Sequence, residues 1–324
     1  MTGKIIGLGA YLPEKILTNA DLAKMVETSD EWITERTGIK QRHISDPLNE
    51  KPSQMVVKAA VQAVEDAGID PKDIDLIINA TTTSDLMFPT LSCVLHKALG
   101  VREDCATFDV SSACPGWLAA FNSAQNFIAT GNAKLALVTG VECTSNFVNW
   151  EDRGQCILFG DGAGAAVLKA EEGEPNRYIM RSFGELSDCL HCDNARQPGR
   201  RDEEGFEELT MFNMDGREVF RFAVTEVPKI IRNLSSKCDF KLEDIDWFVL
   251  HQANARIIEN TARKLKVSLK KFPMNIERTG NTSCASIPIL LKEMKDNGQL
   301  MRGMKLVFAS FGGGLTCDAN YIEY

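Results

Sequence analysis

The chain has 324 residues, of which 44% are hydrophobic, enough to build two ordinary domains or one large duplicated domain. Its formal charge of −9, from 36 basic and 45 acidic residues, gives no support to a nucleic-acid-binding role. No apolar run approaches the roughly 20 residues of a membrane span, and neither a charged-then-apolar leader nor a framework spacing accompanies the ten cysteines. We therefore expect a globular cytoplasmic protein with reduced thiols.

The first predicted unit is an amphipathic helix over residues 53–67, which leads through a Gly-containing linker into an apolar strand over residues 74–80. Next, residues 106–118 run from a short β-type segment through a turn of small residues into a helical pattern that continues to Gly131. Cys114 lies at the start of this helix, and Pro115 fits the first helical position.

A thiol at a helix start lies in the field of the first-turn amide groups, which favours the thiolate over the neutral form, whose ordinary pKa is about 8.5. Cys114 is therefore our candidate nucleophile. The alternative is a cysteine that only packs, because free cysteine is among the most buried residue types.

A metal site is the other chemistry that the cysteines could support. Cys189, His191 and Cys192 are close in the sequence. However, a structural zinc ion needs four ligands, and no second pair of suitable spacing lies nearby. We therefore expect no metal.

The second half of the chain repeats the elements of the first. Residues 218–235 are predicted as a helix and residues 245–251 as a strand, in the order of residues 53–67 and 74–80. The later segments 305–310 and 312–322 likewise match 134–140 and 160–168. One ancestral α/β unit used twice, with mixed and mostly parallel sheets, accounts for this pattern.

Polar residues of the second half follow its predicted strands. His251 comes directly after a strand, and Asn281 lies in a Gly-containing turn before a helical run over residues 287–297. The segment 311–314, Phe-Gly-Gly-Gly, lets backbone N–H groups approach a ligand closely. Ligands of open α/β sheets bind at the carboxyl ends of strands, so we expect these groups to meet Cys114. Taken alone, a core histidine and an ordinary turn residue remain the commoner interpretations.

Between residues 254 and 271, six basic residues stand against one acid. A solvated helix face is the commoner cause of such a run, and a docking surface for an anionic partner is the alternative.

Four motifs in this order, Cys114, His-Gln-Ala-Asn at 251–254, Gly-Asn-Thr-Ser at 280–283 and Phe-Gly-Gly-Gly at 311–314, give the chain a family resemblance. It resembles β-ketoacyl-acyl-carrier-protein synthase III of type II fatty acid synthesis over essentially its whole length, including Thr-Ser-Asp-Glu-Trp-Ile at 28–33 and Phe-Gly-Asp-Gly-Ala-Gly at 159–164. The resemblance implies an α/β, thiolase-like fold with αβαβα layers, halves at residues 1–172 and 173–324, and a homodimer.

The family condenses an acyl-CoA primer, often acetyl-CoA, with malonyl-acyl-carrier protein, and it needs no cofactor beyond the CoA thioester substrate. The resemblance implies that Cys114 carries the acyl group and that the backbone N–H groups of Cys114 and Gly313 form the oxyanion hole. It further implies that His251 and Asn281 donate hydrogen bonds to the enolate formed when malonyl-acyl-carrier protein loses carbon dioxide.

The resemblance also implies substrate contacts. Trp32 and Arg153 would stack on the adenine of CoA, with Thr28 and Arg36 near the nucleotide. The pantetheine channel would be lined by Met214, Gly216, Phe220, Ala253 and Asn254. Phe88 resembles a residue that closes the partner's acyl pocket, and acyl-carrier protein would dock on Arg221, Arg256, Arg263 and Lys264.

The chain departs from the family pattern at Pro115, at Trp117, in the charged segment 182–210, and at Cys317 and Asp318. Pro115 leaves the Cys114 N–H intact, so catalysis should survive it, whereas the other differences bear on primer length and pocket shape. One alternative is therefore a specialised superfamily member with an unusual primer. Another is a non-catalytic module that binds acyl-CoA or carrier protein.

Overall fold

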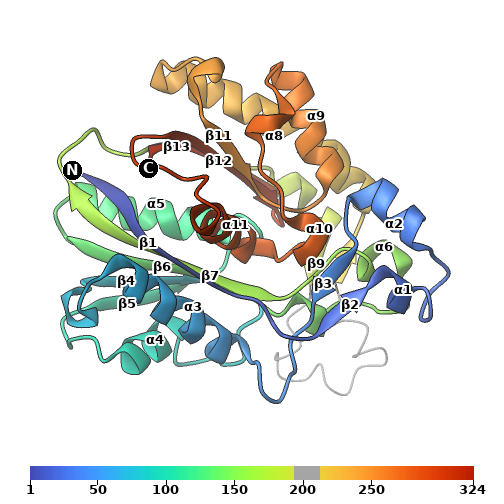
Figure 1. Cartoon of the computed structure of the whole chain (residues 1–324), viewed down its shortest axis with the longest axis horizontal. Coiled ribbons are helices and arrows are strands. Elements are labelled where there is room, and N and C mark those ends of the chain that lie inside the picture. Colours follow the sequence, from blue (N-terminus) through green and yellow to red (C-terminus); the bar gives the residue numbers. More distant parts are fainter. Residues whose placement is uncertain (193–211) are drawn as a thin grey trace.

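The computed structural model describes residues 1–192 and 212–324, and its first half forms a five-stranded sheet (Figure 1). The strand order is β1 (Thr2–Tyr11), β7 (Gly162–Glu171), β6 (Leu135–Glu142), β4 (Leu76–Ala80) and β5 (Ala106–Val110). Strand β4 is parallel to β5 and β6, whereas β7 is antiparallel to β1 and β6. The loops after β4, β5 and β6 therefore begin at one edge of the sheet.

The second half forms a four-stranded sheet. Its order is β11 (Trp247–Leu250), β12 (Lys305–Gly312), β13 (Thr316–Glu323) and β8 (Arg177–Ser182). Strands β11 and β12 are parallel, and β13 is antiparallel to both β12 and β8. The two main sheets thus take their strands from opposite sides of residue 172.

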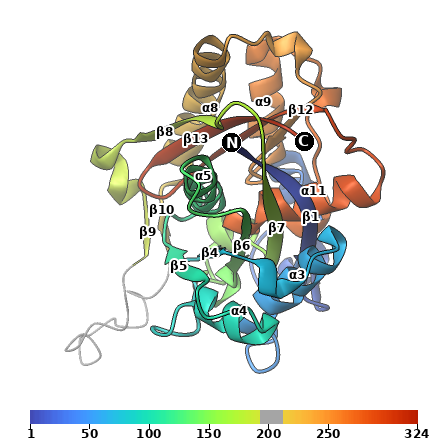
Figure 2. The ribbon, with the colours of Figure 1, turned by 90° about the vertical axis from the view of Figure 1, so that its left-hand side faces the viewer.

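Helices separate and cover the sheets in five layers. Helices α5 (Gly116–Ala129) and α11 (Ser286–Asp296) lie between the two sheets, as Figure 2 shows for α5. Helices α3 (Pro52–Ala67) and α4 (Leu91–Leu99) cover the outer face of the first sheet. Helices α8 (Gly216–Cys238) and α9 (Ala255–Leu265) cover the second. The predicted αβαβα layering is confirmed.

Small residues allow the layers to approach closely. A Cβ atom on Gly9 of β1 would lie 2.0 Å from the carbonyl oxygen of Ala59, and one on Gly164 of β7 would lie 2.7 Å from Cγ of Pro288. Larger residues would push α3 and α11 off the first sheet. The glycines of these strands therefore determine how close α11, which follows the predicted Asn281 turn, comes to the first half.

The remaining elements are short. They are β2 (Ile16–Thr18), α1 (Asn19–Leu22), α2 (Asp30–Thr37), β3 (Gln41–His43), α6 (Arg153–Cys156), β9 (Leu190–Cys192), β10 (Phe212–Met214), α10 (Ile276–Thr279) and the 3₁₀ turns η1 (Pro71–Asp73), η2 (Thr144–Asn146), η3 (Gly184–Cys189), η5 (Leu242–Asp244), η6 (Leu269–Lys271) and η7 (Ser283–Ala285). Among the described residues, no helix is both long and apolar enough to cross a membrane.

The predicted elements differ from the observed ones mainly at their ends. Helix α5 begins at Gly116 and has Pro115 as its N-cap, not as its first helical residue. Strand β4 begins at Leu76 because η1 occupies the preceding turn. Of the charged segment 182–210, residues 193–210 lie outside the described part of the chain.

Candidate active site

Cys114 lies in the loop between β5 and α5, on a sharply turned backbone. Ala113 has a φ of 46°, in the left-handed region that Ala rarely adopts, and its carbonyl accepts a hydrogen bond from the Gly116 N–H at 2.9 Å. The end of β12 packs directly on this turn. A Cβ atom on Gly312 would lie 2.7 Å from Cβ of Cys114, so only Gly fits there. The strained turn therefore holds Cys114 against the Gly-rich segment.

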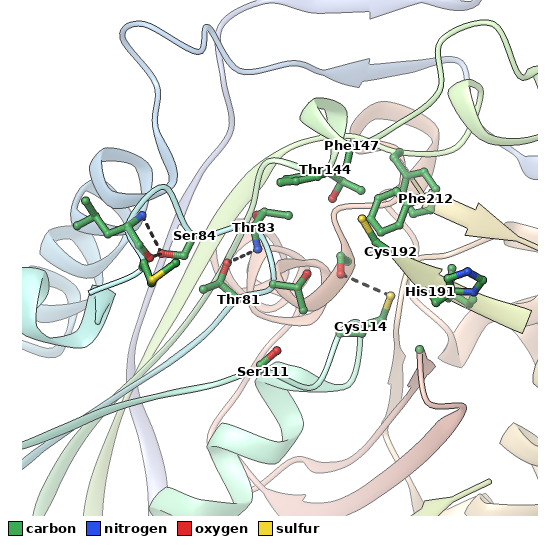
Figure 3. Close-up of a pocket in the computed structure, with 18 residues that line it drawn as sticks. Thr81, Thr83, Ser84, Ser111, Cys114, Thr144, Phe147, His191, Cys192 and Phe212 are labelled. Atoms are coloured by element: carbon green, nitrogen blue, oxygen red, sulfur yellow. Dashed lines mark hydrogen bonds between the residues drawn. The ribbon is translucent and has the colours of Figure 1, made fainter. Parts of the chain in front are cut away.

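The thiol of Cys114 is neutral at rest. Its sulfur lies 3.5 Å from the hydroxyl of Ser283, which donates a hydrogen bond to it (Figure 3). Burial raises the pKa of Cys114 to about 11, although the Ser283 hydroxyl lowers it, and the charge of Glu142 raises it further. The expected thiolate is therefore corrected, because desolvation outweighs the stabilisation that we expected from the helix start.

His251 follows β11 and is also uncharged. Its side chain is buried, and this burial lowers its pKa to about 3. Nδ1 lies 2.7 Å from Oγ of Ser286, which itself accepts the Gln252 N–H at 3.4 Å. With the Ser286 hydroxyl as the donor to Nδ1, the proton of the neutral ring lies on Nε2, which can then donate. Nε2 has no hydrogen-bond partner among the described residues.

Asn281 is fixed by the turn that carries it. Its backbone bridges to the segment before β7, with its N–H donating to Leu158 at 2.9 Å and its carbonyl accepting from Gly160 at 3.0 Å. The side-chain oxygen accepts the Ser283 N–H at 2.8 Å. The amide NH₂ is therefore the part of the Asn281 side chain left to meet a substrate.

One cavity brings the three predicted catalytic side chains together. Cys114, His251 and Asn281 all line it, although they come from both halves of the chain. The same cavity is lined by all five residues predicted for the pantetheine channel, namely Met214, Gly216, Phe220, Ala253 and Asn254. The sulfur of Cys114 therefore shares this cavity with the residues predicted to hold pantetheine.

A second cavity, of about 660 Å³, is also lined by Cys114 (Figure 3). Gly313 lines it beside Ala113, next to the nucleophile in the chain. Several residues of its wall carry hydroxyl groups: Thr81, Thr82, Thr83, Ser84, Ser111 and Thr144. The sequence analysis missed these residues and Ser283, although the position of residues 81–84 directly after a predicted strand was an available signal.

The residues predicted to bind the nucleotide surround Trp32 on α2. The guanidinium carbons of Arg36 and Arg153 lie 4.4 and 4.7 Å from the centroid of its ring. Thr28 has a buried hydroxyl with no partner among the described residues. Asn254 donates a hydrogen bond to the carbonyl of Arg36 at 3.1 Å. This bond connects α2, which carries Trp32 and Arg36, to Asn254 of the predicted pantetheine channel.

The predicted docking residues lie on α8 and α9 and are exposed: Arg221, Arg256, Arg263 and Lys264. Arg256 lies over the ring of Phe220, 5.6 Å from its centroid, beside the pantetheine channel. Lys264 donates to the carbonyl of Val224 at 2.9 Å, and Arg221 pairs with Glu218. Of the four, Arg256 is the one whose guanidinium group lies against a residue of the pantetheine channel.

Several departures from the family pattern lie away from both cavities. Trp117 packs in the middle layer against Phe121 and Phe308, with ring centroids 5.2 and 6.1 Å away. Cys317 and Asp318 are buried in β13, and burial raises the pKa of Asp318 to about 7. Neither cavity is lined by Trp117, Cys317 or Asp318.

Phe88, the residue predicted to close the acyl pocket of a partner subunit, is 80% exposed.

Metal chemistry gains no support from the described residues. Within residues 1–192 and 212–324, no three His, Cys, Asp or Glu side chains gather as a metal site would require. His191 instead pairs through Nδ1 with the carbonyl of Asp188 at 3.1 Å.

Cys114, His251 and Asn281 line one cavity of a duplicated α/β fold, which is the arrangement that the resemblance to a condensing acyltransferase implies. The profile "3-Oxoacyl-[acyl-carrier-protein (ACP)] synthase III" matches residues 108–185, and that of its C-terminal part matches residues 236–324. The chain belongs to the 3-oxoacyl-[acyl-carrier-protein] synthase III family of fatty acid synthesis.

Individual relatives match this chain over almost its whole length. "Beta-ketoacyl-[acyl-carrier-protein] synthase III" of Clostridium acetobutylicum is 46% identical, covering 99% of this chain and 98% of that protein. The protein of the same name from Methylococcus capsulatus is 44% identical with the same coverage. The crystal structure of 3-oxoacyl-[acyl-carrier-protein] synthase III from Aquifex aeolicus is 41% identical, covers 99% of this chain and 100% of that chain, and has a TM-score of 0.92.

Proposed function

We propose that this enzyme starts fatty acid chains by condensing the acetyl group of acetyl-CoA with malonyl-acyl-carrier protein. The observation that carries the proposal is the common cavity of Cys114, His251 and Asn281, which the pantetheine-channel residues also line. The products are 3-oxoacyl-acyl-carrier protein, CoA and carbon dioxide.

In the first half-reaction, the sulfur of Cys114 attacks the thioester carbonyl of acetyl-CoA. A C–S bond to Cys114 forms, the C–S bond to CoA breaks, and the proton lost by the thiol ends on the departing CoA sulfur. The backbone N–H groups of Cys114 and Gly313 hold the oxyanion between these two events. Gly313 suits this role because its backbone lies beside Ala113 with no side chain in the way.

In the second half-reaction, malonyl-acyl-carrier protein loses carbon dioxide, and the electron pair of the broken C–C bond becomes an enolate on the thioester. The Nε2–H of His251 and the amide of Asn281 donate hydrogen bonds to the enolate oxygen. The enolate carbon then attacks the acetyl carbonyl, the bond to the Cys114 sulfur breaks, and the released thiolate takes up a proton from solvent, which restores the thiol. An uncharged imidazole suits this step because it donates a hydrogen bond without giving up a proton.

The first test is a panel of acyl-CoA primers of increasing length and branching, each offered with malonyl-acyl-carrier protein and assayed by product mass. We expect acetyl-CoA to give the highest kcat/KM, by about tenfold or more over a six-carbon primer. Preference for a longer or branched primer would favour the specialised alternative. Binding without any covalent label or product would favour the non-catalytic module.

The proposed adenine contact gives a second prediction. Trp32→Ala is expected to raise KM for acetyl-CoA about tenfold with little change in kcat, because a stack worth on the order of 1–2 kcal/mol is lost. The control is the acetyl thioester of N-acetylcysteamine, which has no nucleotide and should react equally with both proteins. An equal loss with both substrates would contradict the nucleotide role.

The carrier-protein surface gives a third prediction. Reversing charge in the double variant Arg256→Glu and Lys264→Glu is expected to raise KM for malonyl-acyl-carrier protein about tenfold or more, because the carrier is acidic. The effect should shrink at high salt, and acetyl transfer from acetyl-CoA should be unchanged. The matched control is Lys72→Glu. Lys72 lies in η1, just before β4, at the end of the first sheet away from the loops that follow β4, β5 and β6. Equal loss in both half-reactions would contradict the docking role.

A homodimer and a cytoplasmic location complete the proposal. Strand β5 is an edge strand of the first sheet, and Met87 and Phe88 are 63% and 80% exposed. A second copy of the chain would cover the free edge of β5 and these two apolar side chains. The molecular mass in solution tests the dimer. Reduced cysteines, as the spacing of the ten residues suggests, suit the cytoplasm.

A further inference from the structure

Glu142 is a buried carboxyl group that the mechanism above does not use. It ends strand β6 and has no solvent exposure. Its oxygens accept hydrogen bonds from the N–H and hydroxyl of Thr82, both at 3.1 Å, and from the hydroxyl of Thr83 at 2.7 Å. The thiol of Cys284 lies 3.4 Å from the same carboxyl group. A buried group with this many donors has a defined position.

These partners belong to two different walls of the site. Thr82 and Thr83 line the larger cavity together with Cys114. Cys284 follows Ser283, whose hydroxyl donates to the Cys114 sulfur. One carboxyl group therefore connects the loop after β4 with the turn that contacts the nucleophile, although about 200 residues separate them in the sequence.

The charge of Glu142 acts on the surrounding thiols. Burial raises its pKa to about 7, while its bonds to Thr83, Thr82 and Cys284 oppose this rise. The titratable groups that face it are the thiols of Cys114, Cys284 and Cys143, and its charge raises the pKa of each. Asp161 and Asp85 add to the effect at Cys143. These groups are all thiols or carboxyl groups, so none of them carries a positive charge that would offset the negative charge of Glu142.

We propose that Glu142 is a positioning residue of the condensing site. Its carboxyl group holds the loop after β4, which lines the larger cavity, next to the turn that carries Ser283, and its negative charge lowers the reactivity of Cys114. The proposal deepens the proposed function, since it concerns the same nucleophile and the same cavity. It differs from a purely structural role because it links the protonation of one buried group to the reactivity of another.

The test is the rate at which iodoacetamide alkylates Cys114, followed by peptide mass spectrometry between about pH 6 and pH 10. In Glu142→Gln, which keeps the shape of the side chain and removes its charge, Cys114 should react about two- to tenfold faster at about pH 9. At about pH 6 the two proteins should converge, because wild-type Glu142 is protonated there. Cys93, which is exposed on α4 and contacts Thr107, is the internal control and should react equally in both.

A second variant keeps the proposal testable if Glu142→Gln fails to fold. Thr83→Val removes a hydrogen bond that favours the charged carboxylate, so the carboxyl group stays neutral to higher pH. Cys114 should then react faster than in the wild type at about pH 7.5 and equally at about pH 10. An alkylation profile of Cys114 that matches the wild type in both variants would overturn the proposal. Alkylation needs no acyl-CoA, so this outcome is distinct from failure of the primer panel.

Discussion

Substitution of Cys114 with Ser is expected to abolish the acetyl-enzyme and to lower condensation by on the order of 10⁴-fold or more. A hydroxyl is a far weaker nucleophile than a thiol, and the buried site that keeps the thiol neutral disfavours an alkoxide even more strongly. Ser is also smaller than Cys, so the crowded turn against Gly312 can accommodate it. Covalent label after incubation with radiolabelled acetyl-CoA measures the effect.

The matched control is Cys93→Ser. Cys93 is exposed, and a hydroxyl there can keep the contact with Thr107 at 3.2 Å. This variant should retain wild-type labelling and turnover. Labelling of the Cys114→Ser protein at the wild-type level would show that another residue carries the acyl group.

His251→Ala and Asn281→Ala are expected to separate the two half-reactions. Both variants should still form the acetyl-enzyme, while release of carbon dioxide from malonyl-acyl-carrier protein should fall by about 10²- to 10³-fold, because each loses a donor to the enolate. Initial rates of labelled acetyl transfer and of carbon dioxide release measure the two steps separately. Equal losses in both rates would place these side chains in general folding and not in decarboxylation.

The low pKa of His251 adds a pH dependence to this prediction. The imidazole stays neutral down to about pH 3, so carbon dioxide release should not fall through protonation of His251 between about pH 8 and pH 5. Unfolded His takes up a proton near pH 6.5, whereas the folded residue does not, so burial of His251 lowers stability as pH falls from about 6.5 to 3. His251→Ala should therefore lessen the loss of stability over that range in a thermal melt.

The duplicated architecture was predictable because each half carries the same order of helix and strand. The repetition of residues 53–80 in residues 218–251 predicted one α/β unit used twice. Sequence patterns do not show which layer a helix joins, however. The position of α5 between the sheets depends on packing of Trp117 and Phe121 against Phe308 of the second sheet.

The site was predictable to the extent that its residues follow strands or recur in known motifs. Cys114, His251 and Asn281 were identified in this way, and the structure brings them to one cavity. Glu142 was missed because a single polar residue at the end of a strand leaves no periodic signal, and Ser283 was present in a quoted motif but was given no role. The neutral state of Cys114 was missed because desolvation depends on residues that come together only in the folded chain.

The central claim is that Cys114 carries the acyl group between the two half-reactions. The most direct measurement is peptide mass spectrometry after a single turnover, first with acetyl-CoA alone and then after addition of malonyl-acyl-carrier protein. We predict one acetyl group on the Cys114 peptide, and its complete loss as an equal amount of 3-oxoacyl-acyl-carrier protein appears. An acetyl group on a different peptide, or a Cys114 label that persists while product accumulates, would contradict the account.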